Sequence, residues 1–311
     1  MENGDFDVVY ISTPHPLHFQ HVRKALECRR HVLVEKPATM TRDEYEQLVK
    51  MAVGNGVVLM EAMWTRYLPA AKFFKDDLLP RIGEVKRVYA EFSFPIVSGD
   101  LPHSSRFLDK AAGAGSLLDQ GIYALTWADL ALNGLDTSLT KTKVVYANTM
   151  SVPNVPGDVD DINTVILSQQ DSHGDQTAVG IVTTSMTIPG SSKPAFYQRL
   201  RAQKAAPAVR IEAKKASVAI PFPPIRPEEL HIQWYGDNEV DKDGIEREEI
   251  VIKKVERGWG IWYQADVLAE KISLRKAGKE NGEVIGGEES LRILGWMDDA
   301  RRLAGICYDG C

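Results

Sequence analysis

The chain has 311 residues, of which 44% are hydrophobic and 26% are charged, a composition typical of a globular protein with room for two domains. Its 37 basic and 43 acidic side chains give a formal net charge of −6, which argues against a nucleic acid or an anionic membrane as the partner. No apolar run reaches about 18 residues and the first residues lack the basic and apolar regions of a signal peptide, so we expect neither a membrane span nor a leader.

In the first part of the chain, short apolar runs alternate with segments of helical periodicity. A capping box at Thr41-Arg42-Asp43-Glu44 opens the second helical segment, and Gly54-Asn55-Gly56 ends it. Strands that alternate with helices predict βαβ units and a parallel sheet. The expected strands are 7–13, 31–36 and 57–60, and the expected helices are 18–28 and 41–53.

The second strand, His31-Val32-Leu33-Val34-Glu35-Lys36-Pro37, ends in a charged pair and a proline. Because proline cannot continue a central ladder, Lys36 is held at the carboxyl end of this strand. In an open α/β sheet that edge is where ligands bind. From these residues alone, a surface lysine that caps a strand is an equally good interpretation.

A dinucleotide-binding fold begins with a strand, a G-x-G-x-x-G turn and a helix. The G-x-G of this chain, Gly113-Ala114-Gly115, has Leu118 in the sixth position and follows a predicted loop, so we reject it as a phosphate-binding turn. The first strand looks like a late strand of such a fold. We therefore expect that the beginning of such a fold is missing before it.

Beyond about residue 61 the pattern changes to longer alternating strands with few helices, which predicts a large antiparallel sheet in an α+β arrangement. The turn residues at 171–175 predict a hairpin. The proline-rich stretch 221–227 could be an SH3-type ligand, but a stiff connector between strands is the better interpretation. The expected strands are 84–94, 143–152, 161–169, 177–187, 209–213, 217–220, 230–235 and 249–255, and the helices are one that ends at Pro80, 116–132, 261–275 and 288–304.

Asp119 and Tyr123 lie four residues apart on one predicted helix and therefore share a face. A nearby lysine ammonium favours phenolate, so it would lower the pKa of a tyrosine from about 10 towards neutrality. Such a tyrosine takes a proton from an alcohol while hydride leaves the same carbon. Trp64 offers an apolar face to a sugar or an aromatic ring. The alternatives are ordinary: an exposed helix charge, a half-buried core tyrosine and a tryptophan that fills a domain interface.

Together these motifs resemble the Gfo/Idh/MocA oxidoreductase family. Residues 32–37 resemble its E-K-P signature, and residues 13–18 are similar to its T-P-N-x-x-H turn, with His15 at the usual Asn position. Residues 115–123 resemble its G-x-L-x-D-x-G-x-H/Y helix. Tyrosine at the last position, with Glu61-Ala62-Met63-Trp64-Thr65-Arg66 upstream, resembles the branch of dimeric dihydrodiol dehydrogenases and NADP-dependent D-xylose dehydrogenases.

The resemblance implies an incomplete Rossmann-like parallel sheet followed by a mostly antiparallel, open-faced sheet domain. Residues 1–63 would be the remnant of the NAD(P)-binding domain, and residues 64–311 the domain for substrate and dimerisation. The catalytic residues would be Lys36, Tyr123 and Asp119, the substrate residues would be Trp64, Arg66 and Phe94, and the cofactor residues would be Thr13, Pro14, His18, Glu35, Lys36 and Pro37.

The implied activity is hydride transfer to NADP, with NAD as the other possible cofactor. The substrate would be a sugar C1 hydroxyl, as in D-xylose oxidation to its lactone, or a trans-dihydrodiol. A metal is not implied, and the implied assembly is a homodimer. The three cysteines form no CxxC pair and fit reduced thiols in the cytoplasm. The alternative is a non-catalytic regulator that binds a sugar or a protein partner, because the phosphate turn is not found.

Overall fold

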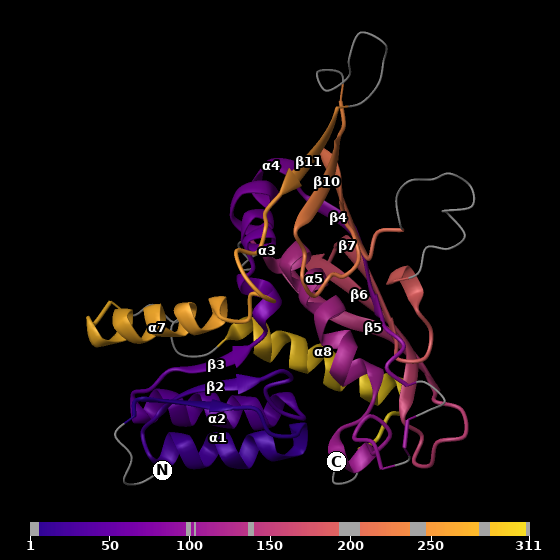
Figure 1. Cartoon of the computed structure of the whole chain (residues 1–311). Coiled ribbons are helices and arrows are strands. Elements are labelled where there is room, and N and C mark those ends of the chain that lie inside the picture. Colours follow the sequence, from indigo (N-terminus) through magenta and orange to yellow (C-terminus); the bar gives the residue numbers. More distant parts are fainter. Residues whose placement is uncertain are drawn as a thin grey trace.

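The computed structural model describes residues 6–97, 101–102, 104–135, 140–192, 206–236, 247–279 and 287–308. The predicted fold class is confirmed, since a small parallel sheet is followed by a large and mostly antiparallel one (Figure 1). Within the described ranges, no helix combines the length and the apolar character that crossing a lipid bilayer requires.

The first sheet contains three parallel strands in sequence order, β1 (Val8–Ile11), β2 (His31–Glu35) and β3 (Leu59–Ala62). One face is covered by α1 (His18–Glu27) and α2 (Arg42–Asn55), and the other by α7 (Tyr263–Lys276) (Figure 1). Burial from both sides explains the unbroken apolar runs of these strands. The predicted capping box of α2 is present, because Thr41 and Glu44 exchange the expected hydrogen bonds.

The second sheet has eight strands in the order β11-β10-β9-β8-β4-β7-β6-β5, and only the β4–β7 pair is parallel. The expected hairpin at residues 171–175 joins β6 to β7, with Asp171 accepting hydrogen bonds from the turn backbone. The strands are β4 (Val85–Ser93), β5 (Thr140–Ser151), β6 (Asp160–Asp171), β7 (Gln176–Ser185), β8 (Val209–Ala213), β9 (Ala216–Ile220), β10 (Glu229–Trp234) and β11 (Glu248–Ile252).

Two helices connect this second sheet to the first. All twelve residues of α5 (Ile122–Asn133) are buried, and the helix lies against β4 and β7 (Figure 1). The helix α8 (Glu288–Ala304) packs against α5, β5 and α2, so it touches both parts of the molecule. The short helices are α3 (Pro69–Phe73) and α4 (Leu79–Ile82). π-Helical turns lie at Phe74–Leu78 and Leu117–Gly121. 3₁₀ turns lie at His15–Leu17, Trp64–Tyr67, Lys110–Ala112 and Gly190–Ser192.

The predicted division of the chain at residues 63 and 64 stays a prediction. The position of α7 qualifies it, because Leu268 and Ile272 of this late helix pack against Leu33 and Met60 of the first sheet. A segment assigned to the second domain thus completes the hydrophobic core of the first.

Candidate active site

Lys36 follows directly after β2, and its side chain reaches the helix that carries Asp119 and Tyr123. Its Nζ donates a hydrogen bond to the backbone oxygen of Asp119 at 2.9 Å and lies 3.4 Å from the Asp119 Oδ1. The same Nζ lies 5.0 Å from the centroid of the Tyr123 ring, over its face. The fold therefore brings these three predicted catalytic residues together, although more than eighty positions separate Lys36 from Asp119.

The Tyr123 hydroxyl is oriented by aromatic neighbours. Trp64 Nε1 donates a hydrogen bond to the Tyr123 Oη at 3.1 Å, and the two rings meet edge to face. The Phe92 ring meets Tyr123 in the same way at 5.5 Å between centroids. Tyr123 is only 7% exposed and Trp64 only 8%, so this hydrogen bond is shielded from water.

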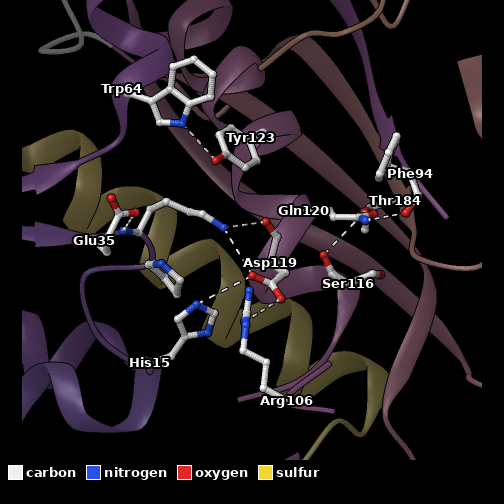
Figure 2. Close-up of polar contacts among 12 residues, drawn as sticks. His15, Glu35, Trp64, Phe94, Arg106, Ser116, Asp119, Gln120, Tyr123 and Thr184 are labelled. Carbon is white, nitrogen blue, oxygen red and sulfur yellow. Dashed lines mark hydrogen bonds and ion pairs between the residues drawn. The ribbon is translucent and has the colours of Figure 1, made fainter. Parts of the chain in front are cut away.

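Asp119 is a buried carboxylate surrounded by basic groups (Figure 2). Besides Lys36, His15 Nε2 lies 3.7 Å from its Oδ1, and Arg106 Nη1 lies 3.5 Å from its Oδ2. Burial alone would raise the pKa of Asp119, but Lys36, His15 and Arg106 outweigh it and lower that pKa below its usual value. Asp119 is therefore ionised at neutral pH.

The basic groups around Asp119 differ in charge. Burial opposes the charge on Lys36, but the nearby Tyr123, Asp119 and Glu35 outweigh it and raise the pKa of the ammonium. Burial lowers the pKa of His15 to about 4, despite the opposing effect of Asp119. At neutral pH Lys36 is therefore cationic, whereas the His15 ring is neutral.

The helix that carries Asp119 and Tyr123 begins at an acidic side chain from the second sheet. Asp160 Oδ2 accepts a hydrogen bond from the Leu117 backbone N–H at 2.8 Å, and Tyr308 Oη donates to Asp160 Oδ1 at 3.2 Å. Gly115 (φ +139°) fits against this carboxylate, because a Cβ there would lie 1.9 Å from Asp160 Oδ1. The sequence analysis singled out Gly115 but not Asp160 or Tyr308, which give no local signal.

The predicted cofactor residues lie at the carboxyl ends of β1 and β2. The His18 ring nitrogens lie 2.7 Å from the Thr13 carbonyl oxygen and 2.8 Å from the Pro37 carbonyl oxygen, so this histidine ties the two strand ends together. Glu35 accepts hydrogen bonds from the Tyr10 hydroxyl and the Lys36 backbone N–H.

In open α/β sheets ligands bind at the carboxyl ends of the strands, and at this edge Lys36 meets the Tyr123 ring. Among the described residues, neither strand-to-helix turn of the first sheet contains glycine, so neither offers a glycine-rich phosphate turn.

The structure does not bring Arg66 into this group of residues. Arg66 Nη1 lies 3.3 Å from Glu61 Oε2 and 3.0 Å from Ser290 Oγ, in a buried ion pair on another side of the 3₁₀ turn 64–67. The tight turn directs Trp64 towards Tyr123 and Arg66 away from it, which the linear motif does not reveal.

Phe94 contacts the helix of Asp119 and Tyr123 through its backbone, since the Gln120 side chain donates a hydrogen bond to the Phe94 carbonyl oxygen at 2.8 Å. The Phe94 side chain is 47% exposed. Two further aromatic residues that sequence reasoning missed continue the ring contacts around Tyr123. Phe222, in the connector 221–227, stacks on Phe92, and Trp259 meets Trp64 edge to face.

Comparison with known proteins places both parts of the chain in one family. Residues 1–63 match the model of an oxidoreductase family with an NAD-binding Rossmann fold, and residues 80–204 match the model of the GFO/IDH/MocA C-terminal domain. The D-xylose 1-dehydrogenase (NADP(+)) of Hypocrea jecorina is 28% identical over 312 residues, covering 97% of this chain and 74% of the relative. The human trans-1,2-dihydrobenzene-1,2-diol dehydrogenase is 28% identical over 304 residues, covering 97% and 78%.

A solved structure shares the fold. The aldose-aldose oxidoreductase from Caulobacter crescentus, complexed with glycerol, has a TM-score of 0.72 at 21% identity and covers 97% of this chain and 78% of its own.

Proposed function

This chain belongs to the Gfo/Idh/MocA oxidoreductase family, and we propose that it is a dehydrogenase that oxidises the C1 hydroxyl of a sugar, D-xylose to its lactone, with NADP as the hydride acceptor. A trans-dihydrodiol is the second substrate class, and NAD is the second cofactor. The names of the two relatives that align with 97% of the chain support these assignments. They give no support to a non-catalytic regulator.

The observation that carries the proposal is the placement of a lysine ammonium 5.0 Å from the Tyr123 ring centroid, at the carboxyl edge of a parallel sheet. Tyr123 accepts the proton of the substrate hydroxyl while hydride leaves the same carbon and a C=O bond forms. The nicotinamide ring, when bound, supplies the hydride acceptor. The catalytic roles of Lys36, Tyr123 and Asp119 are part of this proposal.

Lys36 and Trp64 stabilise the phenol oxygen in different ways. Lys36 acts through its charge, because its hydrogen bonds go to Asp119 and not to the tyrosine hydroxyl. Trp64 acts through a direct hydrogen bond to the oxygen that receives the proton. We therefore assign Trp64 to the positioning of Tyr123 as well as to the substrate side. Asp119, ionised and buried, orients Lys36 and offers its carboxylate to a substrate hydroxyl.

Replacing Tyr123 with Phe tests the proposal, because it removes the proton acceptor and keeps the ring. We expect turnover of D-xylose with NADP to fall by roughly two to four orders of magnitude, measured as NADPH absorbance. Tyr146→Phe is the matched control, since Tyr146 is 52% exposed and lies on β5, the edge strand of the second sheet. A Tyr123→Phe variant that turns over as fast as Tyr146→Phe would refute the assignment.

Two finer expectations belong to the same proposal. The exposed Val145, Tyr146 and Met150 on β5 support a homodimer formed through the second sheet. The free Cys28 and Cys307 support a cytoplasmic location. Light scattering on the purified chain measures its oligomeric state, and a monomer at micromolar concentration contradicts the homodimer.

A further inference from the structure

A cavity of about 560 Å³ opens beside the aromatic residues that surround Tyr123. Its volume is within the roughly 300–1,000 Å³ that is typical of small-molecule sites. Phe222 lines the cavity and stacks on Phe92, which contacts the Tyr123 ring. Trp259 lines it too and contacts Trp64, which holds the Tyr123 hydroxyl. Two ring contacts therefore connect the cavity lining to Tyr123, one through Phe92 and the other through Trp64.

Trp259 presents an accessible indole to this cavity. It is 60% exposed, which is unusual for the largest hydrophobic side chain, and it lies between Gly258 (φ +57°) and Gly260 (φ +81°). The Arg226 guanidinium lies 5.8 Å from the Trp259 ring centroid and donates to the Gly258 backbone oxygen at 3.0 Å. The loop that carries the indole is thus held against the connector between β9 and β10.

The rim of the cavity is polar. Arg226 Nη1 lies 3.3 Å from the Glu228 Oε2, and Glu229 also lines the cavity. Carboxylates and a guanidinium beside an exposed aromatic ring form hydrogen bonds to hydroxyl groups at the edge of a ligand ring while the indole covers its apolar face. Arg226 and Glu228 pair with each other and with backbone groups, and their side chains lie beside the cavity, where the hydroxyl groups of a pyranose ring can meet them.

We propose that this cavity is an outer subsite that binds the second ring of a disaccharide whose reducing-end ring is oxidised beside Tyr123. The inference rests on the proposed sugar dehydrogenase function and extends it from monosaccharides to short oligosaccharides. The second ring stacks on Trp259, and its hydroxyl groups meet Arg226 and Glu228. Trp259 is then a specificity-determining residue for chain length.

The test compares D-xylose with β-1,4-xylobiose in the full chain and in Trp259→Ala. We expect the ratio of kcat/KM for xylobiose to kcat/KM for xylose to fall about tenfold in Trp259→Ala, because one stacked ring face is lost. Effects on the chemistry of the reducing-end ring cancel in this ratio. Trp259→Phe, which keeps a ring, should restore most of it, and Phe6→Ala, at another exposed aromatic residue, should leave it unchanged.

Calorimetry separates this subsite from the proposed reaction. Xylobiose should bind to the full chain about tenfold more weakly after Trp259→Ala, whether or not the chain turns over any sugar. If the chain lacks dehydrogenase activity but shows this loss, the proposed function fails and the subsite stands. If the chain is active but neither ratio nor affinity changes in Trp259→Ala, the subsite is refuted. A loss seen with naphthalene dihydrodiol and not with xylobiose overturns the sugar assignment.

Discussion

The hydrogen bond from Trp64 to Tyr123 makes a quantitative prediction about catalysis. Replacing Trp64 with Phe keeps a ring against Tyr123 but removes the Nε1–H that lies 3.1 Å from the Tyr123 Oη. A hydrogen bond to a group that carries charge contributes roughly 1.5–3 kcal/mol, and burial of both side chains keeps water from replacing it. Because about 1.4 kcal/mol corresponds to a tenfold change in rate, we expect kcat to fall by roughly 10- to 140-fold.

The assay for this prediction follows NADPH formation at saturating D-xylose, together with KM and the urea midpoint of each variant. Trp296→Phe is the matched control, because Trp296 is 3% exposed and its indole donates to the Thr142 backbone oxygen at 3.2 Å. Both variants lose one indole hydrogen bond, but only Trp64→Phe should lose rate. Equal kcat values in the two variants, with Tyr123→Phe inactive, would refute a positioning role for Trp64.

Three further substitutions test the surroundings of the site. Gly115→Ala places a Cβ 1.9 Å from Asp160 Oδ1 at φ +139° and should lower the free energy of unfolding by about 2–4 kcal/mol; a urea midpoint like the wild type contradicts this. His15 has a pKa of about 4 in the folded chain and about 6.5 in the unfolded chain. As pH falls, the unfolded chain therefore binds the proton first, and the free energy of unfolding should decrease by up to about 3 kcal/mol between pH 6.5 and 4. His15→Asn should reduce this pH dependence in urea titrations. A dependence as steep as that of the wild type would show that His15 is not its source. Arg66→Met removes the cationic partner of the buried Glu61 carboxylate and should cost about 3–5 kcal/mol of stability, with the KM for xylose unchanged. A raised KM with normal stability would instead place Arg66 in the substrate site.

The sequence singled out Lys36, Asp119 and Tyr123, which the fold brings together, because each of them carries a local signal. The proline after Lys36 marks the end of a buried strand, and the four-residue spacing of Asp119 and Tyr123 places both on one helix face. Only the fold could show that Lys36 reaches over the Tyr123 ring instead of its hydroxyl, and that Arg106 joins Asp119 from a loop.

The outer parts of the site were missed for a different reason. Phe222 lies in a stretch that was correctly interpreted as a connector between strands, but a connector becomes a cavity wall only when the second sheet folds. Trp259 lies more than 190 positions after Trp64, and no periodicity links the two. Contacts between loops depend on tertiary packing, which local sequence patterns do not encode.

The charges around Asp119 explain why a lysine, and not a neutral donor, belongs beside Tyr123. At neutral pH the Asp119 anion is surrounded by the Lys36 cation, the half-exposed Arg106 cation and the neutral His15 ring. In the proposed reaction, negative charge on the Tyr123 oxygen would lie beside the Lys36 ammonium, which is 5.0 Å from the ring centroid. Without Lys36 the same charge would lie near the buried Asp119 carboxylate, and Arg106, which is half exposed, is screened by water. The charge of Lys36 is therefore the electrostatic contribution on which the proposed proton transfer depends.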